Sequence, residues 1–356
     1  MKNQMAHSEK HTVCYDLLRI LASFLVVIIH VCFQNWTKIS VRSVGWQTLN
    51  VFDGLSHCAV PLFVMISGTV FLRRQEPIEP KTVLKRYIPK LLMAFLFWSL
   101  FYAIFETGFE SVFSMQWIKT VILNCLDYKY HLWFFPEMIV AYLFLPLLWP
   151  LAHYKDGKLV GYACLLFLVL RAGLLTVALL PVPTPVLTWM GKFSVRTGNF
   201  IGYMLLGYYL STVQKKKTAM WLTVLLLILS SLLIIGWNCF LSVRSGEAVD
   251  KVLAIGKLPV ALQAAALFSL FSRLEQSKCL NRCRKPVVRF AGLTLGIYVI
   301  HVFVLEALKK WLHLSVATIG LPMVLSVPLL ALLVYAISAA IAFVLKKLPV
   351  VKDWLV

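Results

Sequence analysis

An arginine and a histidine stand eleven positions apart in the first hydrophobic segment of the chain, at Arg19 and His30. Eleven residues of an α-helix make about three turns, so both side chains lie on one face, roughly 16 Å apart. Histidine is the side chain best suited to accept a proton near neutral pH. A charged group at the centre of a bilayer costs on the order of 2.5–3.5 kcal/mol, and such groups usually line a protein interior or a wet cavity. The pair therefore indicates a functional stripe on the first helix.

The composition that surrounds this stripe belongs to an integral membrane protein. The 356 residues are 60% hydrophobic and 14% charged, with a mean hydropathy of +0.81. The polar stretches are too short to build a separate soluble domain, so we expect one all-α membrane domain over residues 1–356. The first apolar run ends in Gln34, Asn35 and Trp36 instead of a small-residue cleavage site, so it is not a removable signal.

Apolar stretches of about the length that spans a bilayer recur along the chain. They cover residues 17–34, 54–72, 88–107, 132–151, 160–181, 199–213, 219–241, 254–272, 288–307 and 319–345. The sequence therefore predicts about ten transmembrane helices.

Basic residues are distributed unevenly between the two sets of connections. The net charge is +20, and 22 of the 35 Lys and Arg residues lie in alternate connections, against 10 in the others. By the positive-inside rule this places both termini in the cytoplasm. Clusters such as Arg73-Arg74, Lys215-Lys216-Lys217 and Arg282/Arg284/Lys285 are then topology anchors instead of nucleic-acid sites. Alternatively, they attract an anionic cytosolic donor or lipid head groups.

Four histidines fall at similar depth in the outer halves of the predicted helices: His30, His57, His131 and His301. Their segments are distant in sequence, which predicts one polar site that opens outward. An alternative for Asp53, His57 and Glu306 is simple contact with interfacial water, and Arg19 could be a snorkelling anchor paired with Asp16.

Local motifs for other chemistries are missing from the sequence. There is no serine nucleophile elbow, P-loop, Rossmann fingerprint or His-Glu-x-x-His. The eight cysteines have no metal-ligand spacing and are interpreted as buried thiols, with a Cys32–Cys58 disulfide left open. We therefore expect no metal and no tightly bound cofactor.

Five stretches together resemble the acyltransferase 3 family of bacterial multi-pass membrane O-acyltransferases. They are the Arg19-x10-His30 pair, residues 60–68 with Ser67-Gly68, the stretch His131-Leu132-Trp133-Phe134-Phe135, residues 202–209 and residues 295–301. They occur in order over nearly the whole chain. Thr69 departs from the pattern, because the family often has an aromatic residue there.

The resemblance implies transfer of an acyl group, commonly acetyl, from cytosolic acyl-CoA to a hydroxyl of an extracytoplasmic polysaccharide or lipid-linked sugar. It also implies that the membrane is the plasma or inner membrane. His30 would be catalytic, activating the acceptor hydroxyl or relaying the acyl group. Arg19 would contact the phosphates of the donor or hold the geometry of the site. The predicted substrate-binding residues are Ser67, His131, Trp133, Arg171, Tyr298 and His301. Of these, Arg171 is placed on the donor path by its depth alone, and Tyr298 and His301 share a helix face.

Two rival functions fit the same residues. A polytopic transporter of a small solute or glycan precursor would also carry buried ionisable groups, and paired broken helices would favour it. A membrane scaffold without catalysis would leave the outer histidines dispensable. Hydrolysis of acyl-CoA separates the enzyme from both.

Overall fold

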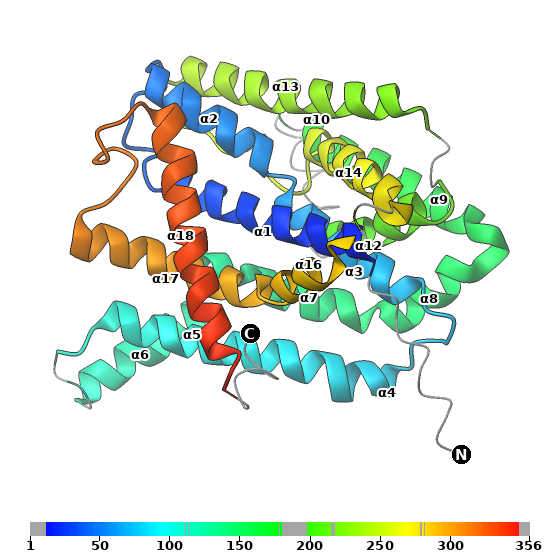
Figure 1. The fold of residues 1–356 in the computed structure, drawn as a ribbon, viewed down its shortest axis with the longest axis horizontal. Coiled ribbons are helices and arrows are strands. Elements are labelled where there is room, and N and C mark those ends of the chain that lie inside the picture. The colour runs from blue at the N-terminus through cyan, green and yellow to red at the C-terminus, as the bar shows by residue number, and fades with distance from the viewer. Residues whose placement is uncertain are drawn as a thin grey trace, which may run out of the picture.

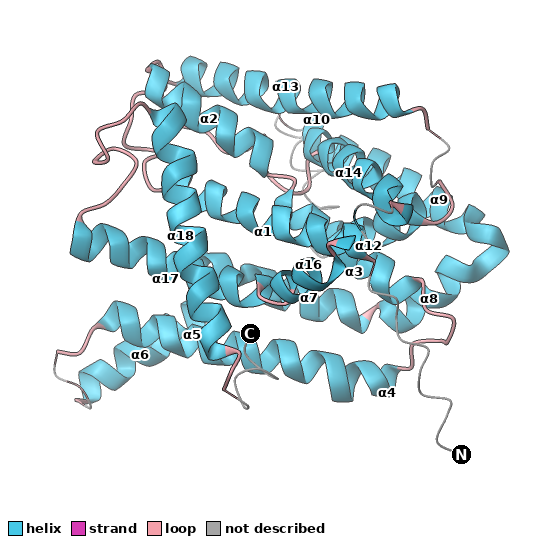
Figure 2. Cartoon of the chain, in the orientation of Figure 1, coloured by secondary structure: helices cyan, strands magenta, loops and turns pink. Residues whose placement is uncertain are grey.

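The computed structural model describes residues 12–110, 112, 114–177, 179, 198–214, 218–277, 280 and 282–348. Within these ranges all regular structure is helical, which confirms the expected all-α class (Figure 2). The α-helices are α1 (Val13–Phe33), α2 (Val44–Ser56), α3 (Ala59–Leu72), α4 (Pro80–Thr82), α5 (Ile88–Thr107), α6 (Met115–Asp127), α7 (Phe134–Leu143), α8 (Leu145–His153), α9 (Lys158–Leu166), α10 (Leu174–Val177), α12 (Gly198–Ser211), α13 (Met220–Ser245), α14 (Leu258–Ser272), α16 (Arg284–Ala291), α17 (Thr294–Leu312) and α18 (Met323–Leu345). Shorter 3-10 and π segments are η1 (Val83–Tyr87), η2 (Tyr130–Trp133), η3 (Tyr154–Gly157), η4 (Phe167–Gly173) and η5 (Arg273–Gln276).

Several of these helices are long and apolar enough to cross a membrane. Six pass by length and composition, and up to eight do if each bent pair counts as one span. They include α1, which at 21 residues is about 30 Å long, close to the thickness of a hydrocarbon core. The structure thus indicates a multi-pass membrane protein. The number ten and the cytoplasmic position of the termini stay predictions, and Lys215-Lys216-Lys217 lies outside the described residues.

The second predicted span begins earlier than expected, because Val44–Leu72 forms one candidate span made of α2 and α3. Polar residues in α2 lower its hydropathy, which is why the apolar pattern begins only at residue 54. The structure pairs these groups: the Gln47 amide donates to the Val41 carbonyl, and the Asn50 amide donates to the Ile235 carbonyl of α13. Paired in this way, polar residues are compatible with a packed membrane interior.

Helix α1 runs through the middle of the molecule and joins two hydrophobic cores (Figure 1). Its N-terminal half, including Leu18 and Ala22, packs with α3 and α14. Its C-terminal half, including Val27 and Val31, packs with α2, α17 and α18. The two ends of one central helix therefore meet different sets of neighbours, and each end can carry a different site.

Helices α3 and α12 approach so closely that only glycine fits at their contact. A Cβ atom on Gly68 would overlap the backbone of Met204, and one on Gly207 would overlap the backbone of Met65. Small residues allow this kind of close helix packing inside a membrane. Both glycines belong to stretches that carry the family resemblance, so part of that pattern serves packing.

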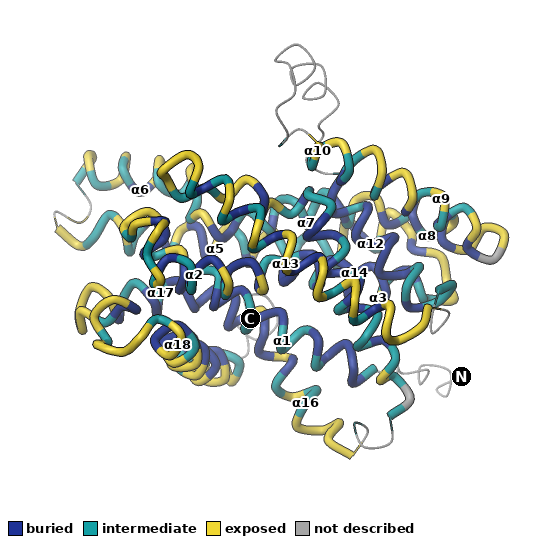
Figure 3. Tube along the Cα trace, turned by 90° about the horizontal axis from the view of Figure 1, so that it is seen from above, coloured by how far each residue is buried: buried dark blue, intermediate teal, exposed yellow. Residues whose placement is uncertain are grey.

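Apolar side chains cover the outside of the helix bundle. Figure 3 shows long exposed stretches on α13 and α18, with buried backbone concentrated in the interior. The exposed residues of α13 include Leu225, Leu229 and Leu232. A soluble protein rarely exposes such a surface, whereas a bilayer requires it.

Candidate functional site

Three histidines from distant segments meet in the middle of the fold. The ring centroid of His30 in α1 lies 5.0 Å from that of His301 in α17 and 6.3 Å from that of His131 in η2. The rings of His131 and His301 are 5.5 Å apart. We call these three residues, with Trp133 and Tyr298, the histidine site.

Main-chain contacts fix the orientation of this site. The Nδ1 atom of His301 lies 2.6 Å from the carbonyl oxygen of Tyr298 and 3.3 Å from that of Ile297. A carbonyl can only accept, so Nδ1 carries the proton and the basic lone pair is at Nε2. The Tyr298 hydroxyl donates to the main-chain carbonyl of His131, which attaches η2 to α17.

A cavity of about 380 Å³ opens beside the rings. Its polar lining comes from His30, His57, His131, Trp133, Asp250, Lys251 and Tyr298. The volume lies in the range of small-molecule sites, and a few polar groups within an apolar lining are typical of them.

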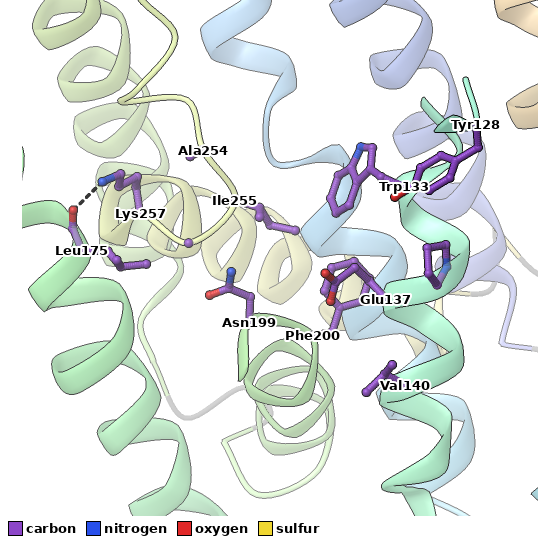
Figure 4. A pocket seen from close by; sticks show the side chains of 12 residues that line it. Tyr128, Trp133, Glu137, Val140, Leu175, Asn199, Phe200, Ala254, Ile255 and Lys257 are labelled. Atoms are coloured by element: carbon purple, nitrogen blue, oxygen red, sulfur yellow. Dashed lines mark hydrogen bonds between the residues drawn. The ribbon is translucent and has the colours of Figure 1, made fainter. Parts of the chain in front are cut away.

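A second cavity, of about 530 Å³, lies next to the first and shares Trp133, Ala254 and Ile255 with it. Figure 4 shows Glu137 and Asn199 side chains around this space, with Lys257 at its far edge donating to the carbonyl of Leu175. Trp133 therefore lines both cavities, and its role in substrate binding stays a prediction.

The N-terminal half of α1 carries a different set of groups. The Arg19 guanidinium lies 3.2 Å from the Asp16 carboxylate, and Arg19 is close enough to Tyr142 of α7 to interact with it electrostatically. The Ser67 side chain also lies next to the Tyr142 hydroxyl. Arg19 and Ser67 thus share a neighbour.

Aromatic rings and a second arginine complete this region. The ring of Phe71 lies 4.9 Å from that of Tyr142 and 5.0 Å from that of Tyr87. The Arg74 guanidinium lies 5.1 Å from the Phe71 ring centroid and donates to the Tyr87 hydroxyl. We call Arg19, Ser67, Arg74, Tyr87 and Tyr142 the arginine site.

The structure thus divides the predicted residues between places. His30, His131, Trp133, Tyr298 and His301 come together, and the outward direction of this site stays a prediction. Arg19 and Ser67 lie apart from them, in the arginine site. Arg171 lies in a third place: its Nε is near Gly198, which begins α12, whereas Ser211 at the other end of α12 contacts Thr69. The donor-path role of Arg171 stays a prediction.

Sequence reasoning gave too little weight to Asp53 and His57. His57 lines the cavity with His30, and its Nδ1 lies 3.4 Å from the Asp53 carboxylate. The spacing Asp-x3-His within one helix is the signal that could have revealed this pair.

A partly exposed ion-pair network was also missed. The Lys129 ammonium lies 2.7 Å from a Glu306 carboxylate oxygen in α17 and also contacts Glu106 of α5. Burial opposes the charge, but the two carboxylates outweigh it and raise the pKa of Lys129. This network anchors the η2 turn that carries His131.

The structure bears on two further questions from the sequence, the Cys32–Cys58 disulfide and the presence of metal-binding groups. Cys32 and Cys58 are both free and buried, so the open disulfide alternative is not formed. Within the described ranges no group of His, Cys, Asp and Glu has the arrangement needed to hold a metal ion.

A family model described as an acyltransferase domain, that of acyltransferase 3, matches residues 13–346, nearly the whole chain. The chain belongs to this family. No curated protein and no solved structure matches the chain significantly. The resemblance seen in the sequence is therefore confirmed, and membership supports acyl transfer by a membrane protein.

Proposed function

We propose that this protein is a membrane O-acyltransferase of the cell membrane that takes an acyl group, acetyl in the simplest case, from cytosolic acyl-CoA. The acceptor is a hydroxyl of an extracytoplasmic polysaccharide or lipid-linked sugar. The observation that carries the proposal is the arrangement of two unlike sites along α1. One site combines arginines with aromatic rings, and the other combines histidines with a cavity.

The arginine site suits the nucleotide end of the donor. Guanidinium groups bind phosphates through several hydrogen bonds, and flat aromatic rings stack on bases. Arg19 and Arg74 supply the charge, and Tyr87 and Tyr142 supply the rings. The thioester stands at the end of a long flexible arm. Phosphates held here could therefore present it toward His30, roughly 16 Å away along α1.

The histidine site suits the transfer itself. A hydroxyl attacks a thioester only slowly until a base removes its proton, and imidazole is the usual base near neutral pH. His30 lines the cavity of about 380 Å³, where a sugar hydroxyl and the acyl carbon could meet. Trp133 offers an apolar face on which a sugar ring can pack.

The test is acetyl-CoA turnover by the purified full chain in proteoliposomes. We expect the wild type to release CoA from radiolabelled acetyl-CoA and the His30→Ala variant to lose this activity. His313→Ala is the matched control, because His313 is an exposed histidine at the end of α17. If a folded wild-type protein turns over no short acyl-CoA, the proposal is wrong.

A transporter remains the second candidate, and one observation favours it. Helices α7 and α8 meet at a bend of 56°, and α16 and α17 meet at one of 52°. Broken helices are common at the binding sites of transporters. Transport without CoA release would support this alternative.

A further inference from the structure

His57 differs from the other histidines of the cavity because a carboxylate holds it. It caps the C-terminus of α2, just before α3 begins at Ala59. Its Nδ1 lies 3.0 Å from the Asp53 carbonyl oxygen and 3.4 Å from the Asp53 carboxylate. Both partners are acceptors, so Nδ1 carries the proton and Nε2 carries the lone pair.

The rings of His30, His131 and His301 crowd one another instead. Ring nitrogens of His30 and His301 are buried without a hydrogen-bond partner among the described residues, and no ion pair there joins these three rings to a carboxylate. A general base becomes a cation when it takes a proton. A cation is costly among buried neutral rings but is stabilised beside a carboxylate.

Of the four histidines, His57 is therefore the one whose ring lies beside a carboxylate among the described residues. Asp53 itself is 5% exposed, so its carboxylate is shielded from water. The same arrangement, a buried carboxylate on the Nδ1 side of an imidazole, orients the general base of serine hydrolases and stabilises the imidazolium that forms when the base takes a proton. The other charged groups that line the cavity, Asp250 and Lys251, have opposite signs.

We propose that His57, held by Asp53, is the general base that deprotonates the acceptor hydroxyl, and that His30 carries the acyl group between donor and acceptor. The inference rests on the proposed acyltransferase function and assigns the steps within it. It separates two tasks, nucleophile and base, that the family resemblance leaves together on His30.

The two steps balance as follows. A ring nitrogen of His30 bonds to the thioester carbonyl carbon, the C–S bond breaks, and CoA leaves as a thiolate. The thiolate takes the proton from the other ring nitrogen, so the acyl-imidazole is neutral. The acceptor oxygen then bonds to the acyl carbon while its proton passes to Nε2 of His57. The C–N bond breaks, its electron pair returns to His30, and the proton held by His57 restores the neutral imidazole of His30. A thiol has a pKa of about 8.5, so the thiolate leaves without an acid, whereas an alcohol needs a base.

A single-turnover experiment separates the steps. The purified full chain in detergent is mixed with one equivalent of acetyl-CoA labelled in the acetyl group and quenched at short times. Released CoA and label retained on the protein are measured for wild type, His57→Gln, Asp53→Asn, His30→Gln and the control His313→Gln. Water serves as the acceptor in this assay.

We expect His57→Gln to release one equivalent of CoA and to keep the label, with transfer of the label from the protein to water slowed about 100-fold or more. Asp53→Asn should give a smaller defect of the same kind, and it serves as the second variant if His57→Gln unfolds. His30→Gln should release no CoA and take up no label, and His313→Gln should match the wild type.

Two results would overturn the inference alone. In the first, His57→Gln and Asp53→Asn match the wild type. In the second, these variants neither release CoA nor retain the label. A wild type that releases no CoA from acetyl-CoA or other short acyl-CoAs overturns the proposed function instead, and this inference with it.

Discussion

The arginine site and the histidine site both include residues of α1, but their charged and ionisable groups have different kinds of neighbours. In the first, each guanidinium meets a carboxylate or a ring: Arg19 contacts Asp16, and Arg74 contacts Phe71 and Tyr87. In the second, the imidazoles crowd together, and a carboxylate holds only His57 among the cavity's described histidines. The first arrangement is suited to hold a permanent anion, whereas the second is suited to move a proton.

The two sites also depend on different kinds of packing. Near the arginine site, α3 and α12 touch through glycine, so the backbones set the geometry. At the histidine site, rings from α1, η2 and α17 touch one another, and side chains set the geometry. Variants should therefore affect chemistry at one site and donor binding or stability at the other.

The largest expected effect on turnover comes from removing an imidazole from the histidine site. His30→Gln keeps a polar side chain but removes the imidazole, so we expect acetyl-CoA turnover to fall about 10²–10⁴-fold. The KM for acetyl-CoA should stay within a few-fold, because the donor phosphates bind elsewhere. Steady-state CoA release in proteoliposomes measures both, with His313→Gln as control. A large rise in KM with unchanged kcat would mean that His30 contributes to donor binding, which contradicts two separate sites.

The next effect concerns the arginine site. Arg19→Ala removes a charge-assisted contact worth about 1.5–3 kcal/mol, so the KM for acetyl-CoA should rise about 10–100-fold. The kcat at saturation should fall much less. Lys81→Gln, an exposed basic residue before α5, is the matched control for lost positive charge. If Arg19→Ala instead lowers kcat at an unchanged KM, Arg19 acts in the transfer step.

A third variant tests backbone packing between α3 and α12. Gly207→Ala places a Cβ against the backbone of Met65, and overpacking of this kind typically costs about 1–3 kcal/mol. We expect a lower midpoint of thermal unfolding in detergent. Gly236→Ala on α13 is the control, because no atom lies within 4 Å of the added Cβ, and alanine favours a helix more than glycine does. Equal midpoints for the two variants would contradict the close contact.

The smallest effect sharpens the role of Lys129. Lys129→Met leaves Glu106 and Glu306 facing each other and loosens the turn that carries His131, so turnover should fall about 3–10-fold. The control is Lys119→Met on the exposed face of α6. Normal turnover and unchanged stability in Lys129→Met would show that this ion-pair network does not support the histidine site.

The stability difference between wild type and Lys129→Met should depend on pH with a definite sign. The pKa of Lys129 is raised in the folded protein, so its contribution is complete below the ordinary lysine value of about 10.4. The contribution is lost as the pH rises through the higher folded pKa. Thermal unfolding at pH 8 and above pH 10.4 should show the difference between the two proteins shrinking.

Much of this protein could be predicted from its sequence. The apolar segments identified a helical membrane protein because the bilayer demands long apolar helices wherever they lie in the chain. The spacing of Arg19 and His30 placed both on one helix, and the ordered motifs identified the family. These are local properties, fixed by residue type and helical period.

Other features required the tertiary structure. Ser67 was predicted to bind substrate, but the sequence did not say which residues would surround it. Only the packing of α3 against α7 puts it beside Tyr142 and Arg19. The start of the second span was predicted too late. The partners of Asn50 and Gln47 lie elsewhere in the chain, and hydropathy does not count them.

The histidine site shows the division most clearly. The sequence determined that several histidines occur at similar depth. Only the fold decided that His30, His131 and His301 lie against one another. The reason is physical: residue types along a helix set which groups are available, but contacts between groups more than 100 residues apart depend on how the helices pack.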